Sequence, residues 1–480
     1  MWNTVWLGVV ALLVIISFTE WFRRWRNPKC RVLPPGSMGF PLIGETLSLI
    51  MPSYSLDLHP FIKTRLQRYG PIFKTSIVGR PAVVSADPKF NNYIIQQEGR
   101  LVELWYLDIL SKLLVFEGES PTTALGAIHK YGRSAIMNCI GAERIKKRLL
   151  PQIEESINKT LRAWSTQSSV EVKHAIGNMV VDFTAEKTLG YDAKKSSTCL
   201  GDAFKRINES LMSLPLNFPG TAYNKCLKER KEIISNFKDI LKERCLSPNT
   251  NKGDDLLGQM INDMDSEKFL TEDFIVQYIF AVVFASFESI SSVLTLALKL
   301  LSEKPSAMEE LKDEHEKILK NREDKNSSLT WDEYKSMTFT LQVINETLRM
   351  GNVAPGLLRR TLKDVSVKEY TIPAGWTVML VTSAQQLSPN TFKDPLEFNP
   401  WRWKELDSYV VSKNFMPFGG GMRQCAGAEY SKAYAATFLH VLFTKYRWTI
   451  IKAGKIARDP ILGFGKGVHI KFSEKENLDS

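Results

Sequence analysis

Apolar residues form one nearly unbroken run at the start of the chain. Residues 2–18 are almost all apolar, and as a helix they would be about 25 Å long, which suffices for a short membrane span. Five basic residues follow this run, between positions 23 and 31. A cleaved signal peptide usually carries its basic residues before the apolar run. We therefore expect an uncleaved anchor whose basic flank stays cytoplasmic, with a signal peptide as the alternative.

A second apolar run lies in the middle of the chain, at residues 276–301. Glu288 is its only charged residue between Gln277 and Lys299. A helix that is apolar on every side is buried in protein or in lipid, and this one is long enough to cross a membrane. Hydroxyl side chains around Glu288 favour a central helix of a soluble domain over a second membrane span.

Residues with high strand propensity predict strands in two places. Residues 70–87 (GPIFKTSIVGRPAVVSAD) indicate a hairpin with a turn at residues 79–81. Residues 365–382 (VSVKEYTIPAGWTVMLVT) indicate two strands that flank a Pro-Ala-Gly turn. Helical patterns dominate between positions 90 and 350. We therefore expect a mainly α fold with a small β region.

One large catalytic unit is expected behind the amino-terminal segment, since no low-complexity linker or internal repeat divides the chain. We predict a transmembrane anchor at 1–22, a hinge at 23–45 and a catalytic domain at 46–480. The hinge contains LPPGSMGFPLIGE, in which three prolines and three glycines disfavour a helix. Another loop, LMSLPLNFPGTAYNK (211–225), precedes a basic helix. It is either a substrate lid at a membrane surface or an ordinary packed loop.

The composition is that of a globular protein, with 44% hydrophobic and 24% charged residues. The net charge is +11, and without residues 1–31 the chain keeps 58 basic and 51 acidic residues, a net charge of +7. A basic body suits an anionic membrane surface or an acidic protein partner, or it reflects scattered surface lysines. No basic motif is interleaved with aromatic residues, so we expect no nucleic-acid partner.

The spacing of the cysteines in the sequence singles out Cys425 as a candidate ligand. The chain has six cysteines, at 30, 139, 199, 226, 245 and 425, and no two are spaced as C-x-x-C. Neither a disulfide framework nor a structural zinc site is therefore expected, which is consistent with a reducing, cytosol-facing compartment. Cys425 differs from the others because it lies in PFGGGMRQCAG (417–427), near four glycines.

The residues around Cys425 favour a haem-thiolate centre. A thiolate needs a metal or a positive partner at neutral pH, and haem iron accepts a single cysteinate ligand. The glycines at 419–421 allow a tight turn close to a flat group, Arg423 can bind a propionate, and Gly427 leaves room after the ligand. The spacing F-x-x-G-x-R-x-C-x-G, which starts at Phe418, favours this reading over the alternative, a cysteine buried as a small apolar residue.

With this motif the chain resembles the cytochrome P-450 haem-thiolate monooxygenases, over nearly its whole length. The segments ETLR, FNPWRW and HKYGR match further motifs of that family. The resemblance implies that Glu346, Arg349 and Arg402 form a buried structural cluster behind the cysteine loop. It also implies that Cys425 is the axial ligand of the haem b iron. The cofactor-binding residues that it implies are His129, Arg133, Arg359, Phe418, Arg423, Cys425 and Gly427.

The central helix resembles the family's oxygen-binding helix at ASFESI (285–290). Glu288 and Ser289 match its acid–alcohol pair, which implies that they are catalytic and relay protons during oxygen activation. The sequence departs from the family with Ser286 in place of the usual glycine and Ser289 in place of the usual threonine. Serine keeps the hydroxyl but lacks the β-branch that restrains a threonine rotamer. The alternative role for Ser289 is a hydrogen bond back to its own helix.

The places where this family contacts substrate are mostly aliphatic or aromatic here, which suits a large apolar ligand held by few polar groups. The substrate-lining candidates are Leu104, Trp105, Leu107, Phe284, Ala285, Val353, Ala354, Leu357 and Leu462. Some of them are alternatively plain core. Segments such as FASFESIS and NFMPFGGGMRQCAGAEYSK are most similar to the plant clan that oxidises brassinosteroids and triterpenoids. Within that clan the chain is most similar to the subfamily with cucurbitane-type oxidases and sterol side-chain-cleaving relatives.

This resemblance implies a monooxygenase that inserts oxygen from O2 into a tetracyclic triterpenoid or phytosterol, by hydroxylation or by successive oxidation to a ketone. It implies electrons from NADPH through NADPH-cytochrome reductase. It also implies a single-pass position in the endoplasmic reticulum membrane, with the catalytic domain facing the cytosol. Three alternatives stay open: a sterol side-chain-cleaving oxidase, an oxygen-independent hydroperoxide lyase or isomerase, and a non-enzymatic sterol- or haem-binding protein. The intact cysteine loop and the Glu288–Ser289 pair argue against the lyase.

Overall fold

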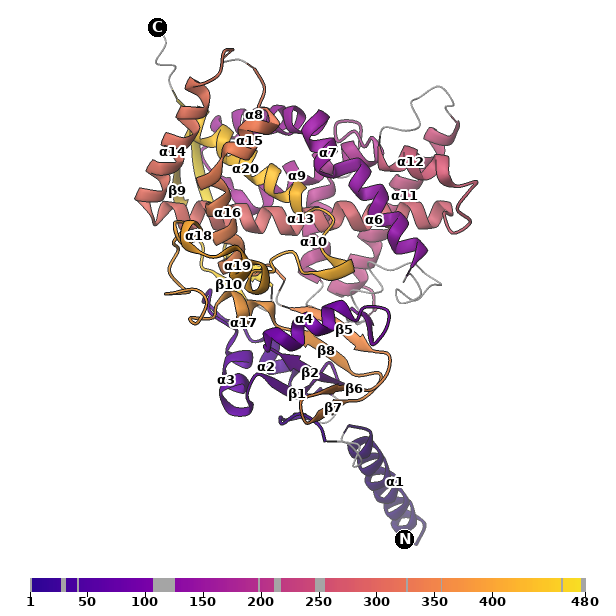
Figure 1. The fold of residues 1–480 in the computed structure, drawn as a ribbon. Helices are drawn as coiled ribbons and strands as arrows, with labels where there is room; N and C mark the ends of the chain where they lie inside the picture. Colours follow the sequence, from indigo (N-terminus) through magenta and orange to yellow (C-terminus); the bar gives the residue numbers. More distant parts are fainter. Residues whose placement is uncertain are drawn as a thin grey trace.

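Helices make up most of the chain in the computed structural model, as the long periodic stretches predict (Figure 1). The structure describes residues 2–26, 32–40, 43–106, 126–196, 199–210, 217–246, 255–324, 327–354, 356–458 and 461–475. The longer helices are α1 (Trp2–Arg26), α3 (Pro60–Tyr69), α4 (Pro88–Gln96), α6 (Ala127–Ile140), α8 (Leu150–Ser165), α9 (Val172–Leu189), α10 (Leu200–Ser210), α11 (Ala222–Leu246), α12 (Leu256–Asp263), α13 (Glu272–Ser302), α14 (Pro305–Lys320), α16 (Thr338–Gly351) and α20 (Ala428–Lys445). The shorter ones are α2 (Thr46–Ile50), α7 (Ala142–Arg144), α15 (Trp331–Ser336), α17 (Thr382–Gln386), α18 (Arg402–Glu405), α19 (Ser408–Asn414), the π-helical η1 (Ile145–Leu149) and the 3-10 helix η2 (Gly421–Arg423).

Helix α13 forms the centre of the helical body. Its amino end is capped by the Thr271 side chain, which accepts a hydrogen bond from the N–H of Phe274, and two acidic residues in its first turn favour the positive end of the helix dipole. The helix packs against α9, α10, α11 and α16. Because apolar residues surround it on all sides, this central position buries most of its length. The predicted central helix is confirmed.

Strands are few and short, and most of them gather at one end of the molecule, near α1 (Figure 1). They are β1 (Ile72–Ile77), β2 (Arg80–Ser85), β3 (Val102–Leu104), β4 (Val170–Glu171), β5 (Leu357–Thr361), β6 (Val365–Val367), β7 (Tyr370–Ile372), β8 (Thr377–Leu380), β9 (Tyr446–Lys452), β10 (Ala457–Arg458), β11 (Leu462–Gly463) and β12 (His469–Glu474). The largest sheet has the order β1-β2-β8-β5-β3, in which only β2 and β8 are parallel. The mainly α fold with a small β region is therefore as predicted.

The central strands of this sheet are buried on both faces. In β2, Val83 packs into one apolar cluster, whereas Ala82 and Val84 pack into another on the opposite face. In β8, Val378 and Met379 divide between the same two clusters. Strands covered on both sides have continuous apolar runs, which explains why their sequence lacks a polar alternation.

Two details of the predicted strands are wrong. The turn between β1 and β2 lies at Val78 and Gly79, which have φ angles of +51° and +71°, so the residues at 80 and 81 belong to the second strand. Two positive φ angles produce the tight turn whose twist matches paired strands. Residues 365–382 form three strands, because a second turn at Lys368 (φ +51°) divides the first predicted strand into β6 and β7.

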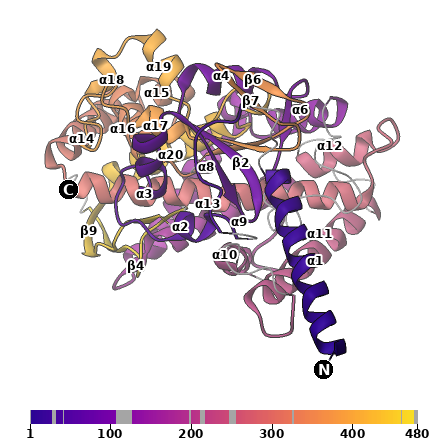
Figure 2. The ribbon, with the colours of Figure 1, turned by 90° about the horizontal axis from the view of Figure 1, so that it is seen from below.

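The amino-terminal helix stands apart from the body. Figures 1 and 2 show α1 projecting from the remainder of the chain. It ends at Arg26, beyond the predicted anchor boundary at residue 22. By length and composition, one helix of the described ranges could cross a membrane, namely α13, and 72% of its most apolar window is buried in protein. Gly8–Glu20, within α1, is a shorter apolar helix.

Candidate active site

The loop around Cys425 is shaped by turns that need glycine. It lies between η2 and the start of α20. Gly419 and Gly421 have φ angles of +69° and +64°, in the left-handed region. A Cβ on Gly421 would lie 2.9 Å from Ile95, so a larger residue does not fit there. The N–H of Cys425 donates to the carbonyl of Phe418 at 3.0 Å, which closes the loop on itself.

A cavity of about 670 Å³ lies beside Cys425. Its wall is mostly apolar and includes Ile136 from α6, Val293 from α13 and Leu348 from α16. Residues distant in the sequence, from the end of β3 to Ile461, therefore meet around one space. The predicted site residues that line it are Leu104, Trp105, His129, Arg133, Ser289, Val353, Ala354, Leu357, Arg359, Phe418, Arg423 and Cys425.

Other predicted substrate-lining residues lie elsewhere. Leu462 is fully buried in the apolar core, and the neighbouring Ile461, which directly precedes β11, lines the cavity instead. Phe284 packs edge to face against Phe204 at a centroid distance of 5.3 Å. Ala285 is exposed one helical turn before Ser289 without lining the cavity.

Two further predicted positions complete this comparison. Leu107 lies outside the described residues. Gly427 does not line the cavity, and a Cβ on it would make an ordinary contact of 3.9 Å with the sulfur of Cys425.

One edge of the cavity carries buried charges that share a carboxylate. The Nε atoms of Arg359 and Arg423 lie 2.6 Å and 3.2 Å from the carboxylate oxygens of Glu98. Glu98 also accepts a hydrogen bond from the N–H of Leu104 at 2.9 Å. Burial lowers the pKa of Arg359, and the negative charge of Glu98 opposes that shift. Glu98 thus holds both arginines beside the cysteine loop.

The residues around the cavity fit a haem group. A flat ring with two carboxylates needs an apolar slot, one axial ligand and cations at one edge. The Nη2 atom of Arg423 is buried and has no hydrogen-bond partner within the part of the chain that is described, so it suits an incoming carboxylate. Burial, with the charges of Arg423 and Arg133, lowers the pKa of His129, so this imidazole is neutral at pH 7 and can donate one N–H.

The thiol of Cys425 needs a metal to become a thiolate. Its surface faces the cavity, but the surrounding protein removes bulk water, and this desolvation raises the pKa of the thiol. The N–H of Gly427 and the charge of Arg133 lower that pKa only in part. Arg133 also donates to the carbonyl of Gln424, so it supports the loop directly. A bound iron is the partner that would keep this sulfur deprotonated.

The acid and the alcohol of α13 face different surroundings. Ser289 lines the cavity, and its hydroxyl donates to the carbonyl of Ala285 at 2.9 Å, as the alternative reading expects. Glu288 does not line the cavity. Its carboxylate accepts hydrogen bonds from Lys173 at 2.6 Å, from Asn208 at 2.9 Å and from Ser292 at 2.9 Å. The two groups are adjacent in the sequence but not in direct contact.

The predicted structural cluster is assembled around one buried carboxylate. Glu346 accepts hydrogen bonds from Arg349 at 2.8 and 2.9 Å and from Arg402 at 3.0 Å. The N–H of Asn399 and the indole N–H of Trp403 complete its coordination, both at 3.1 Å. Glu346 and Arg349 are fully buried. A buried charge is tolerated only when it is fully paired, as it is here.

Comparison with known proteins agrees with this geometry. The family model described as cytochrome P450 matches residues 34–467. The chain belongs to the cytochrome P450 family. It is 56% identical over 477 residues to cucurbitadienol 11-hydroxylase of Siraitia grosvenorii, covering 99% of this chain and 100% of the relative. It is 50% identical over 476 residues to beta-amyrin 16-alpha-hydroxylase of Maesa lanceolata, covering 99% and 100%.

A solved structure shares the fold of this P450. Retinoic acid bound cyanobacterial CYP120A1 superposes with a TM-score of 0.80 at 23% sequence identity, over 93% of this chain and 100% of that one. Family membership makes the protein a monooxygenase that depends on haem, O2 and electrons from a reductase, with an apolar substrate.

Sequence reasoning missed several residues of this P450 site. Glu98 sits at the end of α4, in a segment without a motif, and only its contact with two arginines reveals its role. Lys173 pairs with Glu288 across two helices. Tyr278 lines the cavity from the same face of α13 as Ser289 and Val293, and the helical spacing of these three residues could have indicated it.

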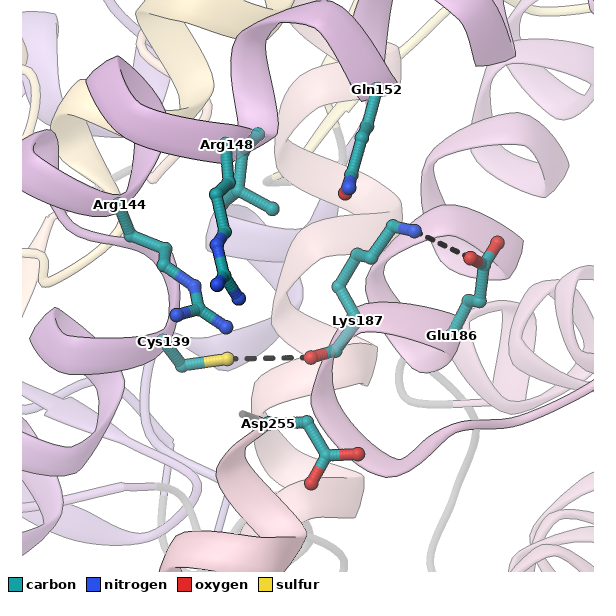
Figure 3. A pocket seen from close by; sticks show the side chains of 8 residues that line it. Cys139, Arg144, Arg148, Gln152, Glu186, Lys187 and Asp255 are labelled. Carbon is teal, nitrogen blue, oxygen red and sulfur yellow. Dashed lines mark hydrogen bonds and ion pairs between the residues drawn. The ribbon is translucent and has the colours of Figure 1, made fainter. Parts of the chain in front are cut away.

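A second cavity in this P450 has a different character. It has a volume of about 210 Å³ and lies near Cys139, with charged side chains around it, including Arg144, Arg148 and Asp255 (Figure 3). The thiol of Cys139 donates to the carbonyl of Lys187 at 3.4 Å, and burial raises its pKa to about 11. A small polar cavity around a protonated thiol does not suit a porphyrin. Cys425 is therefore the better ligand candidate.

Proposed function

We propose that this P450 hydroxylates a tetracyclic triterpenoid or a phytosterol, with successive oxidation to a ketone as a further outcome. The observation that carries the proposal is the mostly apolar wall of the cavity beside Cys425, since the part of it that a haem would leave free, near Val353, Ala354 and Ile461, suits an apolar ligand with few polar groups. The relative whose name refers to cucurbitadienol, a tetracyclic triterpenoid, supports this substrate class. The relative whose name refers to beta-amyrin, a pentacyclic triterpenoid, supports the broader class of triterpenoids.

The roles proposed for this chain's residues follow from their positions. Haem b would be held by Cys425 through its iron and by Arg359, Arg423, His129 and Arg133 through its carboxylates. When bound, haem supplies the iron at which O2 is activated with electrons that come from NADPH through the reductase.

Side chains of the protein would then exclude water, orient the substrate and deliver protons. The apolar walls exclude water from the reacting carbon and orient the substrate, as Val353 and Leu357 line them near the cysteine loop. The Ser289 hydroxyl lines the cavity and would pass its proton into it after giving up its hydrogen bond to the carbonyl of Ala285. The Glu288 carboxylate would take a proton from solvent and return it to that hydroxyl through water or a side-chain rotation.

We propose a single-pass membrane position, with the anchor at residues 1–22, a hinge at 23–45 and a cytosol-facing catalytic domain at 46–480 in the endoplasmic reticulum. Apolar side chains along α1, such as Leu13 and Ile15, are more than half exposed, which supports burial in lipid. Exposed apolar side chains at the end of the hinge and at the start of the catalytic domain support the same placement. They are Phe40, Ile43, Leu47, Ile50 and Met51.

The test is expression of the full chain with a plant reductase in yeast microsomes. The microsomes are fed cucurbitadienol, beta-amyrin, cycloartenol, sitosterol and cholesterol, and products are identified by mass spectrometry. An oxygenated tetracycle whose formation needs NADPH and O2 is expected. A shortened side chain would indicate a sterol-cleaving oxidase instead. No product from any of them, despite a normal carbon monoxide spectrum, would refute the substrate class and leave the haem site intact.

The substitution Glu288→Gln is expected to slow turnover by about 100-fold, the lower end of what general acid–base catalysis contributes. The amide keeps the size of the side chain and its acceptor oxygen toward Ser292 or Lys173, so haem content should not change. Turnover is measured as product per carbon-monoxide-binding haem, together with NADPH consumed per product.

A matched control is Glu272→Gln, which removes an exposed carboxylate from the first turn of the same helix. This control should turn over at the wild-type rate. Unchanged turnover in Glu288→Gln would mean that Glu288 only pairs with Lys173, and lost haem would assign it a structural role.

A further inference from the structure

The buried guanidinium of Arg458 donates hydrogen bonds to three backbone carbonyls at the end of α16. Arg458 donates through Nη2 to the carbonyls of Met350 at 2.9 Å and Gly351 at 2.7 Å, and through Nη1 to that of Asn352 at 3.2 Å. Its side chain is 5% exposed, and no carboxylate of the described residues pairs with it. The negative end of the helix dipole takes the place of a counterion.

The chain turns sharply at the last of these carbonyls. Asn352 has a φ angle of +41°, in the left-handed region, and directly precedes Val353 and Ala354, which line the cavity. Its side chain donates to the carbonyl of Arg349 at 2.7 Å and accepts a hydrogen bond from Gln386. The side chain of Asn352 is thus held by the carbonyl of Arg349 and by Gln386, and its own carbonyl is held by Arg458. Of these three residues, Arg458 is the one that belongs to the sheet formed by β10 and β11.

The backbone of Arg458 belongs to another wall of the same cavity. Arg458 pairs with Leu462 in the β10–β11 ladder, and Ile461, between them in the sequence, lines the cavity. The strand is also tied to the amino-terminal part of the body, because Arg458 and Ser53 exchange backbone hydrogen bonds of 2.7 and 2.9 Å. The guanidinium therefore joins the wall at Val353 and Ala354 to the wall at Ile461.

We propose that Arg458 is a positioning residue that sets the distance between these two walls and thereby selects which carbon of the substrate faces the haem that Cys425 would hold. The selection part of this inference rests on the proposed function, whereas the placement of the walls does not. Lysine cannot replace the arginine, because three acceptors that diverge from one helix end need the planar fork of N–H donors, and an ammonium group on a flexible stem does not hold them at fixed positions.

The test compares Arg458→Lys and Arg458→Met with the wild type in full-length microsomal protein. Both variants should keep a thiolate-type carbon monoxide spectrum. The ratio of the positional products from the best substrate should change by about tenfold, because small displacements of a bound substrate have large effects on which bond reacts. Arg447→Lys, an exposed arginine of β9, is the control and should leave the ratio unchanged.

A second readout does not depend on any triterpenoid. The dissociation constants of 1-phenylimidazole and 4-phenylimidazole are measured by absorbance, since both ligands bind haem iron but direct the phenyl ring along different walls. Their ratio should shift about fivefold or more in both Arg458 variants and not in the control. An unchanged ratio together with unchanged products would overturn the proposal.

The outcomes separate this inference from the proposed function. A shifted phenylimidazole ratio without any sterol or triterpenoid product, even from the wild type, would refute the substrate class while supporting the role of Arg458. Loss of the thiolate-type spectrum in both variants would show that Arg458 stabilises the haem core, which contradicts a positioning role.

Discussion

Replacing Cys425 by alanine is expected to abolish the thiolate-type absorption of the reduced, carbon-monoxide-treated protein and all product formation. The sulfur is the only side-chain ligand that the loop offers to iron from this side of the cavity, and a methyl group cannot coordinate a metal. Absorption spectra of microsomes and the haem content of the purified protein measure this result. The folded body should persist, because the loop is closed by backbone hydrogen bonds such as that from the N–H of Cys425 to Phe418.

The matched control for this substitution is Cys139→Ala. Cys139 is a buried thiol in the second cavity, and its sulfur bonds only to a backbone carbonyl. This variant should keep the spectrum and the activity at a small cost in stability. A thiolate-type spectrum that survives in Cys425→Ala would refute the ligand assignment, and its loss in Cys139→Ala alone would transfer that assignment to the second cavity.

The substitution Glu346→Gln is expected to lower the free energy of unfolding by about 3–5 kcal/mol, because it leaves two buried guanidinium groups without their counter-charge. Glutamine has nearly the same shape as glutamate, so the effect is electrostatic and not due to a cavity. Arg349 is fully buried and Arg402 nearly so, and neither can regain water without disrupting the packing at the end of α16. Thermal unfolding and the fraction of haem-loaded protein measure the effect.

Glu310→Gln is the control for this prediction. Glu310 accepts hydrogen bonds from Trp401 and Lys404 close to the same region, but its ion pair is partly exposed. A loss of about 1 kcal/mol or less is expected there. An equal loss of unfolding free energy in the two variants would show that the buried Glu346 cluster stabilises the haem core no more than a partly exposed ion pair does.

Much of the cofactor site could be read from short segments. The positive φ angles of Gly419 and Gly421 follow from residues within ten positions of Cys425. The central helix is likewise evident from the unbroken apolar run around Glu288, because a helix with no polar face has to be buried. The glycine turns depend on local backbone geometry and the buried helix depends on an apolar run, and both can be recognised from residues that are neighbours in the sequence.

Other parts of the site depend on contacts between distant segments. Glu98 lies more than 250 positions before Arg359 and Arg423, and no periodicity connects them. Leu462 pairs with Arg458 and packs in the core, whereas the adjacent Ile461 lines the cavity, and neither placement is visible in the two apolar residue types. The parallel pairing of β2 with β8 is a similar case, since these two strands are separated in the sequence by the helices from α4 to α16.

The sequence by itself determined the fold class, the cysteine loop and the family, since each is expressed in residue spacing or in hydrophobic pattern, and the family resemblance in turn implied the Glu346 cluster. Only the tertiary structure decided which way Glu288 turns, that Glu98 joins the two arginines, and that Arg458 ties the ends of α16 and β10 together. The physical reason is that buried charges must find partners wherever the fold places them, and their positions result from packing across the whole chain.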